Sequence, residues 1–138
     1  MEEFRSKPPA ALAPRPISLP SWHQTTLANG LAIVIVEDSR LPLTSFRLAF
    51  RFGDAHDPAE LPGLSDMLAG LLTEGTESRN SRQIADEVAR MGATLTAGAS
   101  SDYTTVAGSA LSRFNDSIFE LIADVTRNHP IPALPTDG

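Results

Sequence analysis

The sequence has 138 residues, of which 41% are apolar, and this composition fits one small domain with a single core. Eleven Lys and Arg against seventeen Asp and Glu give a net charge of −6, which opposes binding to the phosphate backbone of nucleic acids. The sequence contains no cysteine, which excludes disulfides, thiolate metal sites and cysteine nucleophiles. A transition metal would therefore need His or carboxylate ligands.

The N-terminal sequence and the apolar runs indicate where the protein is found. The longest apolar run, residues 31–36, is far shorter than the roughly 20 residues of a membrane-spanning helix. The start, Met1-Glu2-Glu3-Phe4, lacks the basic and apolar regions of an export signal. The sequence as written predicts a cytoplasmic protein without a membrane span, and export would require a native start upstream of Met1.

Proline marks the first segment of the chain. Residues 1–20 carry five prolines among Ala and Ser, a composition that favours extended, solvated backbone and predicts a flexible leader. A proline-rich docking peptide is the alternative interpretation, which composition favours less. The folded domain is expected to cover residues 21–132, followed by a short tail at residues 133–138.

The first ordered segments are predicted to be strands. Asn29-Gly30 is a strong hairpin signal that joins residues 24–27 to the apolar residues 31–36. Residues 45–52 alternate between apolar and polar side chains, which indicates a third strand with one wet face. The apolar face of this strand consists of Phe46, Leu48, Phe50 and Phe52.

A change of period after Pro62-Gly63 predicts two helices. The first places apolar side chains at i, i+3, i+4, i+7 and i+8, so it is expected to bury one stripe. The second is expected at residues 81–91, with a capping box formed by Asn80 and Gln83 and a left-handed stop at Gly92. The stripe of the first helix comprises Leu64, Met67, Leu68, Leu71 and Leu72.

The last part of the chain is predicted to form a hairpin and a third helix. Residues 94–100 and 103–111 are rich in Thr, Ala and Val, which indicates two strands joined at Ser101-Asp102. A helix follows and ends before Pro130. Its apolar face consists of Phe114, Ile118, Leu121, Ile122 and Val125. This order of elements predicts an α+β sandwich in which an antiparallel sheet packs against helices.

Several local phrases occur in the order found in one protein family. Together they resemble the pitrilysin or insulinase family of zinc metallopeptidases, M16, which includes the mitochondrial processing peptidase subunits. The resemblance covers about residues 22–132 and implies an M16 peptidase-like (LuxS/MPP-like) fold, present as the N-terminal part of one domain. The phrases are Leu27-Ala-Asn-Gly-Leu31, Pro62-Gly-Leu64, Glu74-Gly-Thr76, Met91-Gly-Ala93 and Ala123-Asp-Val125.

The resemblance also implies which residues stand at the zinc site. In active members, the helix after Pro-Gly-Leu carries H-x-x-E-H, which supplies two zinc ligands and a general base. An ungapped match places Asp66, Ala69 and Gly70 at the first His, the Glu and the second His. The third ligand, a Glu on a later helix, would lie beyond Gly138. The resemblance therefore implies no zinc site and no other cofactor here, although active relatives use zinc.

Other acidic and histidine side chains are candidate metal ligands by residue type. Asp66 alone cannot supply the three protein ligands of a catalytic zinc, and an acidic residue near a helix N-terminus is the favoured interpretation. Gly70 within a helix indicates either tolerated drift or a close helix contact. Asp54 and Asp57 flank a histidine in a segment that is expected to be a turn rather than a metal loop. The histidines share no metal spacing, and the last is placed to contact a helix C-terminus: His23, His56 and His129.

One strand carries a second role in the family. In M16 peptidases, the strand that matches residues 94–99 is the edge along which substrate peptide lies in extended form. The resemblance therefore implies a peptide-binding edge strand, although Thr96 replaces an asparagine often found there, and an ordinary edge strand is the alternative. Its residues are Thr94, Leu95, Thr96, Ala97 and Gly98.

These observations favour a non-catalytic M16-like protein that acts as a structural, substrate-holding partner of an active zinc peptidase subunit. One alternative is an active zinc metallopeptidase with ligands from elsewhere, and another is a truncated module that binds peptides or proteins. An early end of the domain would leave apolar surface uncovered, which predicts a homodimer or a fragment of a longer chain. The expected partners are a second copy or an active M16 subunit, together with extended peptide, and neither nucleic acid nor membrane.

Overall fold

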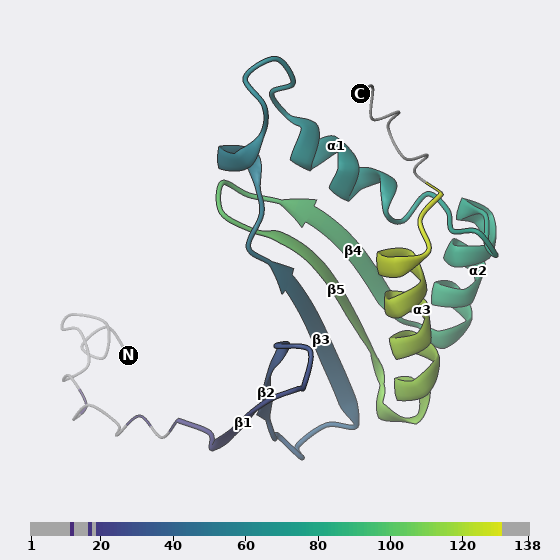
Figure 1. The fold of residues 1–138 in the computed structure, drawn as a ribbon. Helices are drawn as coiled ribbons and strands as arrows, with labels where there is room; N and C mark the ends of the chain where they lie inside the picture. The colour runs from purple at the N-terminus through teal and green to yellow at the C-terminus, as the bar shows by residue number, and fades with distance from the viewer. Residues whose placement is uncertain (1–11, 13–16, 18, 131–138) are drawn as a thin grey trace, which may run out of the picture. The chain divides into compact units, whose positions relative to one another are not determined.

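The structure, a computed structural model, describes Leu12, Ile17 and residues 19–130. These residues belong to two compact units, one ending at Arg40 and the other beginning at Leu41 (Figure 1). The predicted tail at residues 133–138 lies outside the described residues, as does most of the predicted leader at residues 1–20. Within the described residues, no helix is long and apolar enough to cross a membrane.

The first unit contains a β-hairpin. Strands β1 (Trp22–Thr26) and β2 (Ala32–Val36) pair antiparallel, and the predicted turn joins them. The amide of Leu27 donates to the carbonyl of Leu31 at 2.9 Å, and the Asn29 side chain accepts from the Leu31 amide at 3.1 Å. Gly30 has a φ of 85°, a conformation that glycine adopts at little cost. The predicted strand-turn-strand is confirmed.

The second unit contains an antiparallel sheet of three strands in the order β3-β5-β4. The strands are β3 (Leu43–Phe50), β4 (Thr94–Ala99) and β5 (Thr104–Leu111), so β5 is central and β4 is an edge. The hairpin of β4 and β5 confirms the sequence prediction. Both edges of this described sheet have unpaired backbone groups, which can accept another strand.

The third strand begins and ends two residues earlier than predicted. Phe50 is the last residue of β3 to pair, and the chain then turns toward the β4–β5 loop. There the amides of Asp54 and Ala55 donate to the carbonyls of Ser100 and Ser101, each at 3.0 Å. Gly53 allows this approach, because a Cβ at that position would lie 2.0 Å from the Ser100 carbonyl oxygen. Residues 51–52 therefore leave the sheet.

Three helices lie on one side of this sheet (Figure 1). They are α1 (Leu64–Leu71), α2 (Ser81–Met91) and α3 (Asn115–Arg127), with two short 3-10 turns, η2 (Asp54–His56) and η3 (Ser112–Phe114). Helix α2 has the predicted capping box, and Gly92 ends it with a φ of 59°. The element order and the α+β architecture agree with the prediction.

The core lies between α2, α3 and the central strand. Helix α3 buries the predicted apolar stripe except Phe114, which is half-buried beside it. The Phe46 ring of β3 packs on the Phe119 ring of α3, with centroids 4.0 Å apart. Gly108 of β5 lets α3 come close, since a Cβ there would lie 3.0 Å from an Ile122 methyl group. The buried core residues are Ile84, Met91, Val106, Ala110, Ile118, Leu121, Ile122 and Val125.

Candidate functional site

The two sets of predicted site residues come together at one edge of the sheet. Helix α1, which carries Asp66, Ala69 and Gly70, contacts the edge strand β4 (Figure 1). The predicted peptide-binding residues 94–98 all lie within β4. The helix expected to hold the zinc motif and the strand expected to hold peptide are therefore neighbours in the fold.

The N-terminus of α1 is held by a carboxylate from the preceding turn. Asp57 accepts hydrogen bonds from the Gly63 amide at 2.9 Å, the Ser65 amide at 3.0 Å and the Ser65 hydroxyl at 2.5 Å. The Ser65 hydroxyl is the main reason why the pKa of Asp57 is lowered. Because Asp54, His56 and Asp57 form and follow the 3-10 turn η2, the prediction of a turn is confirmed.

The C-terminus of α1 is held by a histidine from the far end of the chain. His129 donates from Nε2 to the carbonyl oxygen of Leu71 at 2.7 Å. The predicted contact of His129 with a helix C-terminus is confirmed, but the helix is α1 and not α3, which precedes His129 in the sequence. Its Nδ1 atom is buried and has no hydrogen-bond partner among the described residues.

The residues expected at the zinc-motif positions differ in exposure. Asp66 and Gly70 are exposed, whereas Ala69 is fully buried. Outside α1 itself, no atom of the described residues lies within 4 Å of where a Gly70 Cβ would be, so no close helix contact explains this glycine within the described part of the chain. Partial desolvation raises the pKa of the nearby Asp54, and the negative charges of Asp66 and Asp57 raise it further.

These residues do not fit a zinc ion. Ala69 and Gly70 have no donor atoms in their side chains, and Asp66 provides one carboxylate where a catalytic zinc keeps three protein ligands. The histidines lie in separate places: His23 in β1, His56 in η2, where its ring stacks on Phe52, and His129 after α3. Among the residues that the structure describes, no three His, Cys, Asp or Glu side chains gather as a metal site.

The predicted buried stripe of α1 is partly wrong. Met67 and Leu71 are 60% and 40% exposed, and the buried residues are Ser65 and Ala69. The helix presents its small side chains to the sheet, because Asp57 fixes its first turn through Ser65. Two apolar side chains of α1 are therefore left on the surface.

Strand β4 presents different side chains on its two faces. Leu95 and Ala97 are half-buried on the side of the helices, whereas Thr94 and Thr96 are exposed on the other side. The hydroxyl of Thr94 shares a hydrogen bond of 2.9 Å with Ser109 of β5. Beyond β4, no further strand pairs with it in the described part of the chain. Its outer backbone groups can pair with an extended segment.

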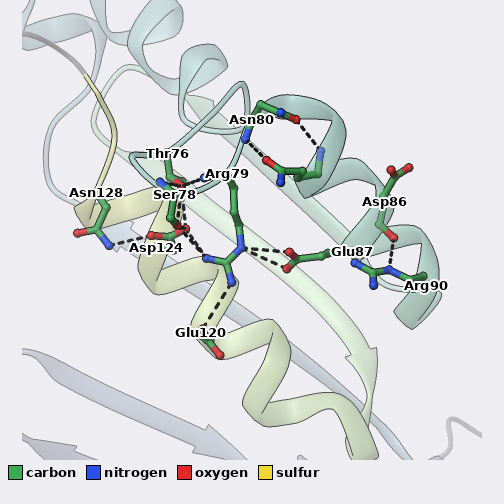
Figure 2. Close-up of polar contacts among 11 residues, drawn as sticks. Thr76, Ser78, Arg79, Asn80, Asp86, Glu87, Arg90, Glu120, Asp124 and Asn128 are labelled. Atoms are coloured by element: carbon green, nitrogen blue, oxygen red, sulfur yellow. Dashed lines mark hydrogen bonds and ion pairs between the residues drawn. The ribbon is translucent and has the colours of Figure 1, made fainter.

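An ion pair with a buried carboxylate, between the α1–α2 loop and α3, was not predicted from the sequence (Figure 2). Asp124 of α3 is 7% exposed and accepts from Arg79 at 2.6 Å, Thr76 at 2.8 Å and Asn128 at 2.7 Å. Burial alone would raise the pKa of Asp124, but the hydrogen bonds from Asn128, Thr76 and Arg79 outweigh it and lower the pKa. This network ties the α1–α2 loop to α3.

Arg79 joins two further carboxylates to the same network. Its guanidinium lies 3.2 Å from Glu87 of α2 and 3.5 Å from Glu120 of α3. The hydrogen bond to Asp124 is the main cause that raises the pKa of Arg79. Thr76 and Asp124 of this network lie in two of the family-like phrases, Glu74-Gly-Thr76 and Ala123-Asp-Val125, whereas Arg79 lies in neither.

Comparisons with known proteins place these features in a family. The model of insulinase (peptidase family M16) matches residues 32–135. An uncharacterized zinc protease of Bacillus subtilis is 25% identical over 100 residues, which are 72% of this chain and 24% of that protein. The mitochondrial-processing peptidase subunit alpha of Solanum tuberosum is 30% identical over 104 residues, which are 75% of this chain and 20% of that protein.

A solved structure supports the same assignment. A peptidase M16 inactive domain from Pseudomonas fluorescens superimposes with a TM-score of 0.74 and is 26% identical. The match covers 81% of this chain and 27% of that one. The chain spans about a quarter of the length of the curated relatives that it matches. Because the family model matches most of its residues, the protein belongs to the insulinase family, peptidase family M16.

Proposed function

We propose that this protein is a non-catalytic member of the M16 family that pairs with an active zinc peptidase subunit and helps to hold its peptide substrate. The observation that carries the proposal is the composition of α1. By the resemblance to the family, Asp66, Ala69 and Gly70 of α1 stand where active members carry two zinc ligands and a general base. Hydrolysis by a zinc-bound water has no support from these side chains.

The geometry of α1 strengthens this proposal. Ala69 is fully buried, so its place in the helix serves packing rather than proton transfer. Asp57 and His129 still hold both ends of the helix. The helix therefore keeps its place beside β4 without metal-binding side chains, as expected of a subunit retained for its surface.

Two of the relatives support pairing. The Solanum tuberosum protein is named as a subunit of a processing peptidase, and the Pseudomonas fluorescens structure is described as an inactive domain. In this protein, Leu61, Met67 and Leu71 expose apolar side chains on and before α1. We infer that a partner subunit covers this surface, and that a second copy covers it when no partner is present.

Peptide holding rests on strand β4. This edge strand contacts α1, and small side chains at Thr96, Ala97 and Gly98 let another backbone approach. A peptide that pairs with this edge gains main-chain hydrogen bonds that do not depend on its sequence.

The test combines metal analysis with light scattering on one preparation purified in the presence of zinc. The proposal predicts less than 0.1 equivalent of zinc, on the order of the background for a protein without a site, and a particle of twice the mass of one chain. An Asp66→Asn variant is the matched control and should give the same two values. One equivalent of zinc that a chelator removes, and that Asp66→Asn lacks, would overturn the non-catalytic assignment, and a strictly monomeric chain would overturn the pairing.

A further inference from the structure

A polar hollow of about 240 Å³ lies on the face of the three-stranded sheet opposite the helices. Side chains of a strand alternate between its two faces. Because Phe46 of β3 packs on α3, its neighbours in the strand fall on the opposite face. We call this feature the sheet hollow. The side chains that line it on this face are Ser45, Arg47, Thr94, Thr96, Ala107 and Ser109.

One side of the sheet hollow is a row of three hydroxyls. The register of the strands places Ser45 of β3 opposite Ser109 of β5, and Ser109 opposite Thr94 of β4. The Thr94 and Ser109 hydroxyls share one hydrogen bond of 2.9 Å, so one of their two protons is free to donate. Among the described residues, the Ser45 hydroxyl has no hydrogen-bond partner. The row therefore offers two hydroxyl protons to a ligand.

The next row on the same face carries a cation. Arg47 is opposite Ala107, which is opposite Thr96, and the small Ala107 side chain leaves the space between the other two open. Arg47 is exposed, and its guanidinium forms no ion pair with a described residue. No acidic residue lines the sheet hollow, so its local charge is positive in a chain of net charge −6.

We propose that the sheet hollow binds a carboxylate group. A carboxylate is planar, carries one negative charge and accepts two parallel hydrogen bonds from a guanidinium such as that of Arg47. Its remaining lone pairs can accept from the hydroxyls around it. The site uses side chains on the face of the sheet and not the backbone edge of β4, so it does not depend on the proposed peptide-holding function. A peptide C-terminus and an acidic side chain both present this group, and the test separates them.

The test is an NMR titration of the full 138-residue chain at pH 7 and constant ionic strength, which follows the Nε–Hε signal of Arg47 and the amides of β4. The probes are N-acetylglycine for a C-terminus, the N-acetyl amide of aspartate for an acidic side chain, neutral N-acetylglycinamide and inorganic phosphate. The proposal predicts saturable shifts with a Kd on the order of 10 mM for a carboxylate probe, as expected for so small a ligand, and none for the neutral amide. The tighter of the two carboxylate probes identifies the source.

Three variants locate the binding. Arg47→Gln should weaken it by about tenfold or more, whereas Arg82→Gln makes the same change at an exposed arginine of α2, on the other side of the sheet, and should leave it unchanged. Thr96→Val removes one hydroxyl at nearly constant shape and should weaken it several-fold, by about threefold or more.

Three results would overturn the proposal. The first is the absence of saturable shifts with both carboxylate probes on the wild-type protein. The second is phosphate binding as tight as that of the better carboxylate probe, which would indicate a general anion site. The third is an equal loss for Arg47→Gln and Arg82→Gln, which would indicate an effect of overall charge. The comparison of probes on the wild-type protein decides the question without any variant.

Discussion

Helix α2 caps its own ends, whereas helix α1 depends on side chains from other parts of the chain. In α2, Asn80 and Gln83 form a reciprocal capping box and Gly92 provides the left-handed stop. In α1, the N-terminus is satisfied by Asp57 and the C-terminus by His129, 58 residues away from its partner. Both helices lie on the same side of one sheet, but only α2 carries its boundaries in its own sequence.

This difference explains how α1 tolerates its unusual composition. Gly70 inside a helix of eight residues costs about 1 kcal/mol relative to Ala, and such a short helix is not stable alone. Buried Ser65 and Ala69, with the two distant caps, supply what the local sequence lacks. Helix α1 therefore depends on tertiary contacts, whereas α2 is also stabilised by caps in its own sequence.

The largest effect is expected where α2 and the preceding loop are tied to α3. Asp124→Ala should lower the free energy of unfolding by about 3 kcal/mol, because it leaves the Arg79 guanidinium without its main partner in a largely buried site. Urea denaturation followed by circular dichroism measures this. Glu120→Ala, which removes an exposed partner of the same arginine, should cost less than about 0.5 kcal/mol. Equal losses for the two variants would contradict the assignment of Asp124 as the centre of the network.

Acid should remove part of the same stabilisation. The pKa of Asp124 is lower in the folded protein than the value of about 3.9 for an unfolded chain, so its contribution is present above pH 4 and is lost as pH falls through the folded pKa. Asp57 has a lowered pKa as well and adds to this trend. Unfolding midpoints in urea between pH 6 and pH 3 should fall less steeply for Asp124→Asn than for the wild type. Parallel pH profiles would show that Asp124 does not contribute.

At the N-terminus of α1, Asp57→Ala should lower Tm by several degrees, because two amides and a hydroxyl lose their acceptor. Differential scanning calorimetry measures the change. Asp54→Ala is the matched control: its carboxyl has a raised pKa beside two negative charges, so removing it should leave Tm unchanged or slightly higher. A fall in Tm for Asp54→Ala as large as that for Asp57→Ala would mean that charge, and not capping, holds this end.

At the other end of α1, His129→Ala should cost about 1 kcal/mol through loss of the hydrogen bond to Leu71. His129→Gln keeps a side-chain donor and should cost less. Hydrogen exchange adds a local readout, in which the last turn of α1 exchanges faster in His129→Ala while α2 is unchanged. Equal acceleration in both helices would indicate general destabilisation rather than loss of a cap.

The smallest expected effect has the opposite sign. Gly70→Ala should raise the free energy of unfolding by up to about 1 kcal/mol, because a Cβ at this helical position has open space around it among the described residues. A Cβ at Gly63 likewise meets no described neighbour, but Gly63→Ala must adopt a φ of 85°, so it should destabilise the protein. If both substitutions stabilise the protein, the positive φ at Gly63 does not disfavour alanine at that position, which would contradict this prediction.

The contrast between α1 and α2 also shows which parts of the structure could be predicted from the sequence. Helix α2 and the β4–β5 hairpin are encoded by local caps, alternation and turn residues, and both were predicted within one residue or so of their ends. The burial of α1 was predicted wrongly at Met67 and Leu71, because its orientation is set by Asp57 from outside the helix.

The buried ion pair of Arg79 and Asp124 joins residues 45 apart, and no local pattern connects them. One family-like phrase contains Asp124 and another precedes Arg79 in the sequence, but neither phrase indicates that these two side chains pair. The edge strand was predicted correctly as an element, while the apolar groove between the end of α1, α2 and β4 depends on how these elements pack. Sequence periodicity does not predict how these elements pack against one another.

The central claim is that α1 keeps its place beside β4 without a metal site. The most direct test is isothermal titration calorimetry of zinc chloride into the purified chain at pH 7, with Asp66→Asn in parallel. We predict no saturable heat and identical traces for the two proteins. One-site binding by the wild type that Asp66→Asn abolishes would contradict the claim and show that Asp66 is a zinc ligand.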